Sequence, residues 1–146
     1  MIICPLCNPE VEQLVWHDAN CRVIHIGEHE GQRFPGYCRI VWQKHVAEMS
    51  DLTEADQRHL MAVVIAVEKS LRELLAPDKI NLASLGNVVP HLHWHVIPRW
   101  RDDSYFPQPI WATPSPDKIW PATRPEFDLS DFRTLLISEL GNGEMQ

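Results

Sequence analysis

The chain has 146 residues, a formal net charge of −7, and 45% hydrophobic and 23% charged residues. These proportions are typical of one globular domain with a sizeable core, and they exclude a chain that is disordered throughout. The acidic balance argues against bulk nucleic-acid binding, because a phosphate backbone requires a basic face. The longest apolar stretch, residues 60–67, is far shorter than the ~20 residues that a bilayer requires, so we expect no membrane span.

The first strands and the long helix are predicted in the N-terminal half. β-Branched residues predict strands over residues 21–26 and 37–42, with a glycine-rich loop between them. Thr53 is a typical helix N-cap, and apolar side chains at helical spacing then predict a helix over residues 54–75. Pro77 ends this helix, because the residue before a proline is driven out of helical geometry.

The second half contains two further strands, over residues 80–85 and 91–97, and a short helix over residues 129–140. No repeated alternation of strand and helix calls for a parallel sheet. The pattern therefore predicts an α+β domain with an antiparallel sheet and one long helix.

A proline-rich arm is predicted beyond the domain of residues 1–99. Seven of the twelve prolines lie in residues 98–125. We expect residues 100–146 to form an arm and the short helix, both packed on the same domain, since proline removes strand hydrogen-bond donors and tryptophan favours burial. For Trp111 two interpretations are open, stacking on a base or anchoring the arm, and anchoring is favoured. The segment contains three tryptophans, Trp100, Trp111 and Trp120.

The N-terminus shows no basic region followed by a long apolar run, so we expect no signal peptide and a cytoplasmic protein. In a reducing compartment cysteines are thiols or metal ligands rather than disulfides. Cys4 and Cys7 form a pair whose spacing alone is compatible with redox chemistry, half of a zinc site or chance; no βαβ pattern supports redox. Cys21 and Cys38 lie in predicted strands and are expected to be small core residues.

Residues 91–97 alternate histidine with apolar side chains. In a strand, His91, His93 and His95 point to one face and the apolar residues point into the core. Three interpretations are open: a solvated face rich in histidine, a site where the three imidazoles bind one metal ion, or a nucleophilic histidine that attacks phosphorus. The uniformly apolar opposite face argues against a chance arrangement.

The segment of sequence HLHWHVI over residues 91–97 resembles the motif of the histidine triad (HIT) family. Residues 37–53, 80–82 and 86–88 resemble, in order and spacing, that family's strand and turn before the long helix, its asparagine strand and its phosphate loop. The resemblance covers residues 4–99. It implies a HIT-like fold and a homodimer that extends the sheet.

The resemblance also implies nucleotide chemistry without an organic cofactor. Family members hydrolyse or transfer nucleoside monophosphates from phosphoanhydride, phosphoramidate or phosphoester bonds. By position, His93 is implied as the nucleophile at the α-phosphorus and His95 as the residue that contacts phosphate near the leaving group. The implied substrate-binding residues are Asn81, Asn87 and Val88.

We therefore expect a hydrolase or transferase that cleaves at the α-phosphate of a dinucleoside polyphosphate or another adenylated small molecule. An adenosine phosphoramidase is one alternative, although Val88 stands where several family members carry a hydroxyl-bearing serine or threonine. A nucleotide-binding regulatory module with little turnover is another. The resemblance further implies a structural zinc ion. Its ligands match Cys4, Cys7, His45 and His91.

Overall fold

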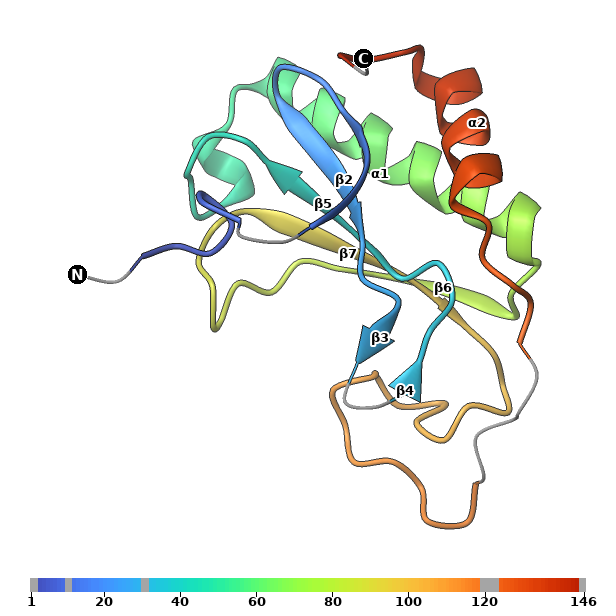
Figure 1. Ribbon diagram of the computed structural model, residues 1–146. Coiled ribbons are helices and arrows are strands. Elements are labelled where there is room, and N and C mark those ends of the chain that lie inside the picture. Colours follow the sequence, from blue (N-terminus) through green and yellow to red (C-terminus); the bar gives the residue numbers. More distant parts are fainter. Residues whose placement is uncertain (1–2, 10–11, 30–31, 119–123, 145–146) are drawn as a thin grey trace.

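The structure, a computed structural model, describes residues 3–9, 12–29, 32–118 and 124–144. Five strands form an antiparallel sheet in the order β1-β2-β5-β7-β6, and two short strands form a hairpin (Figure 1). The elements are β1 (Gln13–His17), β2 (Cys21–His25), β3 (Glu28–His29), β4 (Gln32–Arg33), β5 (Cys38–Trp42), a 3-10 turn (Met49–Asp51), α1 (Glu54–Leu75), β6 (Lys79–Ala83), β7 (His93–Arg99) and α2 (Leu129–Leu140).

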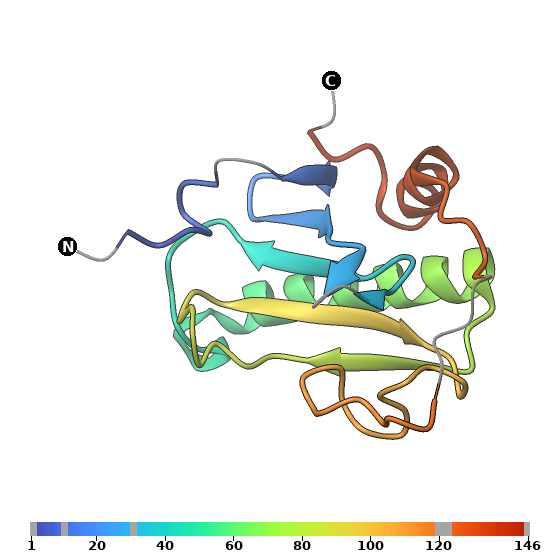
Figure 2. The ribbon, with the colours of Figure 1, turned by 60° about the horizontal axis from the view of Figure 1, so that its bottom comes forward.

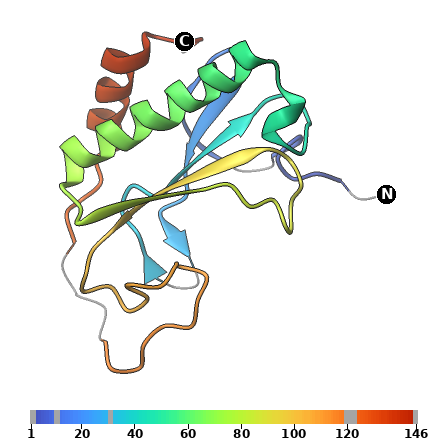
Figure 3. The same ribbon diagram turned by 180° about the vertical axis from the view of Figure 1, so that it is seen from behind.

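Both helices have the predicted bounds. The Thr53 side chain accepts a hydrogen bond from the Asp56 amide at the start of α1, and Ala76 adopts a left-handed conformation just before Pro77. Asp128 caps α2 in the same manner as Thr53 caps α1. Helix α1 crosses one face of the sheet and α2 lies beside it (Figure 3). The predicted α+β architecture is therefore confirmed.

Figure 2 shows the strands of the sheet side by side, with α1 behind them. The register of the strands divides their side chains between the two faces of this sheet. Val23, Ile40 and Trp94 are aligned on neighbouring strands and pack in the core under α1. The next row, which includes Arg39 and His95, points to the opposite face. We call this opposite side the histidine face.

Two segments cover parts of the histidine face. Leu6, from the N-terminal segment, packs with Ile24 and Val41. The arm, orange in Figure 1, covers another part through Tyr105 and Ile110. Ile110 is fully buried, so it anchors the arm, whereas Trp111 is 39% exposed. Trp111 contacts the ring of His95, so its two interpretations, anchoring the arm or stacking on a base, stay predictions.

A buried ion pair organises the arm. The guanidinium of Arg99, at the end of β7, donates to both carboxylate oxygens of Asp103, with distances of 2.8 and 3.1 Å. It also donates to the Asn81 side chain on β6 and to the Gln108 carbonyl. Arg99 and Asp103 are 1% and 0% exposed. We call these four residues the arginine clasp.

The strands differ from their predicted bounds more than the helices do. Strand β7 begins at His93 rather than at residue 91, so His91 belongs to the preceding loop, and β6 ends at Ala83. The strand β1 was not predicted. Trp120 lies outside the residues that the structure describes. Within those residues, no helix is long and apolar enough to cross a bilayer.

Candidate active site and metal-ligand cluster

A cavity of about 490 Å³ opens on the histidine face, between the N-terminal segment, the loop before β7 and the arm. His93 and His95 are nearly buried at 7% and 4% exposure, and both side chains line the cavity. The predicted catalytic pair thus shares one enclosure. The other lining residues are Pro5, Leu6, Arg39, Leu85, Gly86, Asn87, Val88, Val89 and Trp111.

The ring of His93 is fixed by the main chain of its own segment. Its Nδ1 lies 2.6 Å from the carbonyl oxygen of His91. A carbonyl only accepts, so Nδ1 carries the proton and Nε2 carries the lone pair. Burial lowers the pKa of His93, which favours the neutral ring. His93 therefore has the protonation state that a nucleophile requires.

The ring of His95 is fixed by a side chain that the sequence analysis did not assign. The hydroxyl of Tyr37 lies 2.9 Å from Nδ1 of His95. Burial raises the pKa of Tyr37, although the nearby Arg39 guanidinium opposes this, so the phenol stays protonated. A phenol that donates to Nδ1 leaves the ring proton of His95 on Nε2. Trp111 meets the same ring edge-on, with centroids 5.0 Å apart.

The loop before β7 forms one wall of the cavity. Gly86 has a φ of 76°, a left-handed conformation that glycine adopts without strain. Asn87 and Val88 follow it at the cavity, and the Val88 side chain is 93% exposed. Asn81, the third expected substrate-binding residue, does not line this cavity; its side-chain oxygen accepts from Arg99 instead.

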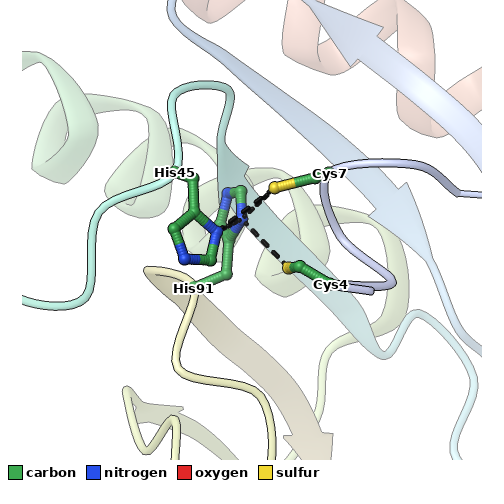
Figure 4. A group of neighbouring side chains, drawn as sticks. All are labelled: Cys4, Cys7, His45 and His91. Atoms are coloured by element: carbon green, nitrogen blue, oxygen red, sulfur yellow. Dashed lines mark hydrogen bonds between the residues drawn. The ribbon is translucent and has the colours of Figure 1, made fainter. Parts of the chain in front are cut away.

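The four expected metal ligands come together at the end of the sheet, as Figure 4 shows. Nδ1 of His91 lies 3.4 Å from the sulfur of Cys4, 3.4 Å from that of Cys7 and 3.1 Å from Nδ1 of His45. The Cys7 sulfur lies 3.2 Å from Nδ1 of His45. Tetrahedral zinc, with Zn–S of about 2.3 Å and Zn–N of about 2.0–2.1 Å, places ligand atoms roughly 3.3–3.8 Å apart. The donor set fits this ion.

The main chain connects the cluster to the cavity. Nε2 of His91 lies 2.6 Å from the carbonyl oxygen of Trp42 and donates to it, which leaves Nδ1 of His91 available as a ligand. The carbonyl of the same His91 accepts from His93. His93 and His95 belong to neither of the two groups of possible metal ligands in the described part of the chain. The interpretation in which three alternating histidines bind one ion therefore does not match the structure.

The family comparison agrees with this geometry. The HIT domain family matches residues 10–102, which contain the triad and both strands beside it. The chain belongs to the HIT family. A histidine triad protein from Bradyrhizobium japonicum superposes with a TM-score of 0.66 and 25% identity, over 96% of this chain and 97% of that one. A HIT protein from Sinorhizobium meliloti has a TM-score of 0.66 and 26% identity, over 88% and 90% of the two chains.

Two curated relatives of this HIT protein carry names that describe activities. An AP-4-A phosphorylase from Mycobacterium tuberculosis is 31% identical over 78 residues, which cover 49% of this chain and 40% of the relative. An asymmetrical bis(5'-nucleosyl)-tetraphosphatase from Schizosaccharomyces pombe is 28% identical over 74 residues, 47% of this chain and 41% of the relative. The matched part therefore spans about two-fifths of either relative.

Three residues of this HIT protein that lie beside the two histidines were absent from the expected site, namely Tyr37, Arg39 and Trp111. Tyr37 and Arg39 lie beside the histidines only because β5 pairs with β7, which the sequence of β5 does not reveal. Trp111 reaches the cavity through the fold of the arm. Signals existed for two of them. A charged residue such as Arg39 within an otherwise apolar strand requires a partner or solvent, and stacking on a base was one of the two interpretations of Trp111.

Proposed function

We propose that this HIT protein is a nucleotidyl hydrolase or transferase that acts on a dinucleoside polyphosphate or another adenylated small molecule. One observation carries the proposal: Nδ1 of His93 is held by the His91 carbonyl, so a neutral ring presents its Nε2 lone pair within the cavity. Family membership and the names of the two curated relatives support the same chemistry.

The reaction proceeds in two balanced steps. In the first, Nε2 of His93 attacks the α-phosphorus, a P–N bond forms, and the bond from phosphorus to the leaving group breaks with its electron pair on the leaving group. In the second, water or phosphate attacks the same phosphorus, the P–N bond breaks, and the nucleotide leaves with the His93 ring neutral again. The strand holds the nucleophile rigidly, which reduces the entropic cost of attack.

His95 acts as a hydrogen-bond donor in this proposal. Tyr37 donates to its Nδ1, so the N–H at Nε2 donates to the departing oxygen and stabilises the negative charge that develops there. His95 keeps its ring proton in both steps: the leaving group departs as an anion, and the attacking water releases its proton to the solvent. The two histidines thus divide the roles of nucleophile and hydrogen-bond donor within one cavity.

The loop before β7 is proposed to hold the nonbridging phosphate oxygens through main-chain amides at Asn87 and Val88, which both line the cavity. Val88 has no hydroxyl to offer a leaving group, so this wall favours a phosphoanhydride over a phosphoramidate substrate. Asn81 is proposed to act through Arg99, which it positions, rather than through contact with the substrate.

The test is turnover of a panel of adenylated substrates by wild type, His93→Ala and the control His17→Ala. The panel holds diadenosine polyphosphates, adenosine 5'-phosphoramidate and adenylated amino acids, with nucleotide release followed by chromatography. We expect His93→Ala to lose at least about 10³-fold in kcat/KM. His17 lies on β1 away from the cavity, so His17→Ala retains full activity.

A rapidly quenched wild-type reaction is expected to show one covalent nucleotidyl group on the peptide that contains His93. Turnover that survives in His93→Ala contradicts the mechanism. Nucleotide binding without turnover on any substrate identifies a regulatory binding module instead. Preference for the phosphoramidate identifies the phosphoramidase alternative.

We also propose that Cys4, Cys7, His45 and His91 hold one structural zinc ion. Four protein ligands fill a tetrahedral shell, so the ion supplies a cross-link between chain segments and no coordination position for a substrate. In this proposal the catalytic steps belong to His93 and His95 alone. Zinc content, measured by elemental analysis, is expected to be one ion per chain.

The functional unit is proposed to be a homodimer with an extended sheet. Strand β6 is an edge of the sheet, and Leu82 and Leu85 are 41% and 50% exposed on it and just beyond it. Exposed apolar side chains beside an open edge favour pairing with another chain. Light scattering of the purified protein is expected to give a mass of twice the 16.9 kDa of one chain. The Leu82→Lys variant is expected to give the mass of a single chain.

A further inference from the structure

Arg39 lies at the junction of two cavities. Its register partners are His95 on β7 and Ile24 on β2, so its side chain leaves the sheet on the histidine face. Diagonal neighbours across a pair of strands are about 7–8 Å apart, which puts His93 within the range of a long arginine side chain. Arg39 lines the cavity of His93 and also a second cavity of about 770 Å³.

The guanidinium of Arg39 retains unused hydrogen-bonding capacity. Its Nε is buried and has no hydrogen-bond partner, and no carboxylate of the described residues forms an ion pair with it. Its close neighbour is Tyr37, whose ring centroid lies 5.9 Å from Cζ. Glu12, which lines the second cavity, is already bound by Arg22. Leaving a buried guanidinium N–H unpaired costs free energy.

An oxyanion is the group that satisfies this side chain. The planar fork of arginine binds phosphate through two parallel hydrogen bonds. The walls shared by the two cavities, Pro5 and Leu6, are apolar and offer Arg39 no acceptor from their side chains. A ligand whose phosphorus lies at His93 has room to extend past Arg39 into the second cavity. The segment of the ligand between the two cavities then lies next to the positive charge of the Arg39 guanidinium.

Resting on the proposed nucleotidyl chemistry, we propose that Arg39 binds a second phosphoryl group of the substrate, adjacent to the one that His93 attacks. The substrate class is thereby narrowed to nucleotides that contain two or more linked phosphates. Arg39 is a specificity-determining residue in this assignment, because it distinguishes the length of the phosphate chain and not the nucleoside.

The experiment measures binding, so that it does not depend on turnover. All proteins carry His93→Ala, so that no ligand is turned over. Calorimetry gives the Kd of AMP, ADP and ATP for this protein alone and for the same protein with Arg39→Gln, with Arg39→Lys or with the control substitution Arg58→Gln. Arg58 is an exposed residue of α1, so its variant tests the loss of one surface charge. Thermal melts verify that each variant is folded, and Arg39→Lys retains the charge if Arg39→Gln does not fold.

With Arg39 intact we expect ADP to bind at least about tenfold more tightly than AMP, the value of one charge-assisted hydrogen bond. We call this ratio of affinities the ADP step. Arg39→Gln is expected to abolish the ADP step, Arg39→Lys to retain a part of it, and Arg58→Gln to retain all of it. A full step in Arg39→Gln overturns the assignment. An equal weakening of AMP and ADP also overturns it, because Arg39 would then bind a part that both ligands share.

The two proposals fail separately. An Arg39-dependent step without turnover of any substrate refutes the proposed hydrolase and supports the assignment of Arg39. Turnover through His93 without such a step refutes only the assignment of Arg39. Absence of binding for all three nucleotides, together with no turnover of any substrate by the wild type, refutes both.

Discussion

His93 and His95 are two residues apart on one strand, yet their Nδ1 atoms have different hydrogen-bond partners. A main-chain carbonyl accepts from Nδ1 of His93, whereas a hydroxyl occupies Nδ1 of His95. One ring therefore presents a lone pair at Nε2 and the other presents an N–H. The proposed nucleophilic attack by His93 and hydrogen-bond donation by His95 both use this difference, which environment rather than residue type creates.

Removing the Tyr37 hydroxyl is expected to slow catalysis without weakening substrate binding. Tyr37→Phe loses one buried hydrogen bond, worth about 0.5–1.5 kcal/mol, so kcat is expected to fall roughly threefold to tenfold with KM nearly constant. The loss arises because Nδ1 of His95 is no longer occupied and the proton is shared between the two ring nitrogens. Steady-state kinetics on the best substrate measure it.

A substrate with a weakly basic leaving group provides the control for Tyr37→Phe. The departing oxygen of such a group carries less negative charge and needs little stabilisation by a hydrogen bond, so the difference in kcat between wild type and variant is expected to vanish. Tyr105→Phe, in the buried cluster that also contains Tyr37, controls for the loss of a neighbouring phenol that does not reach His95. An equal loss of kcat on both kinds of substrate contradicts the role of Tyr37, since a loosened cavity would slow both.

The sequence was sufficient to identify the two histidines but not their partners. Alternation with apolar residues placed His93 and His95 on one face, because strand side chains alternate with period two. Tyr37 reaches His95 across 58 residues of sequence, and the pairing of β5 with β7 is what joins them. A pattern confined to one strand contains no information about this neighbour.

At the scale of elements, the bounds of helices and strands were predicted correctly where capping residues and prolines define them locally. Helix α1 has the predicted start and end because Thr53 and Pro77 act on adjacent residues. Strand β1 was not predicted, because it is only five residues long and only partly apolar. Its pairing with β2 is what makes this segment a strand. The arm was recognised from its prolines, but its path depends on the arginine clasp, whose partners on β6 and β7 are distant in sequence.

Breaking the arginine clasp is expected to destabilise the protein strongly. Arg99→Met leaves the Asp103 carboxylate buried without its partner, at a cost of about 3–5 kcal/mol. Urea unfolding measures the difference, with Arg58→Met as the matched surface control. In the double variant Arg99→Met, Asp103→Leu a part of the stability is expected to return. A change below about 1 kcal/mol in Arg99→Met would show that the clasp is unimportant.

A second contact links the β1–β2 turn to helix α1 and is sensitive to pH. Burial alone raises the pKa of Asp18, but the amides of Cys21 and Asn20 and the ring of His59 outweigh it and lower the pKa. The folded state therefore binds a proton at Asp18 less readily than the unfolded state does. Its contribution to stability is present above the unfolded pKa and is lost as the pH falls through the folded value.

The expected signature is a pH-dependent difference between wild type and Asp18→Asn. At neutral pH the wild type is expected to melt at a higher temperature, and the gap is expected to narrow as the pH falls below about 4. The exposed Asp117→Asn serves as the comparison and is expected to show no such gap. A gap that is constant over this range would assign the effect of Asp18 to packing and not to its charge.

At the scale of the whole molecule, the Cys/His cluster joins three regions that are far apart in the chain. The N-terminal segment brings Cys4 and Cys7, the loop after β5 brings His45, and the loop before β7 brings His91 (Figure 4). The cysteine spacing alone left three readings open, and the resemblance to the HIT family was needed to complete the ligand set. The structure brings the four side chains into contact, and through the His91 carbonyl it connects them to His93.

Removing the proposed zinc ion is expected to loosen the whole fold while leaving the proposed chemistry intact. A strong chelator, or Cys4→Ser with Cys7→Ser, removes the cross-link, and the melting temperature is expected to fall on the order of 10 °C. Well below the new melting temperature, kcat is expected to fall less than about tenfold, because no catalytic step uses the ion. Loss of all activity in the folded, metal-free protein would identify a catalytic ion, and an unchanged melting temperature would show that the cluster holds no structural metal.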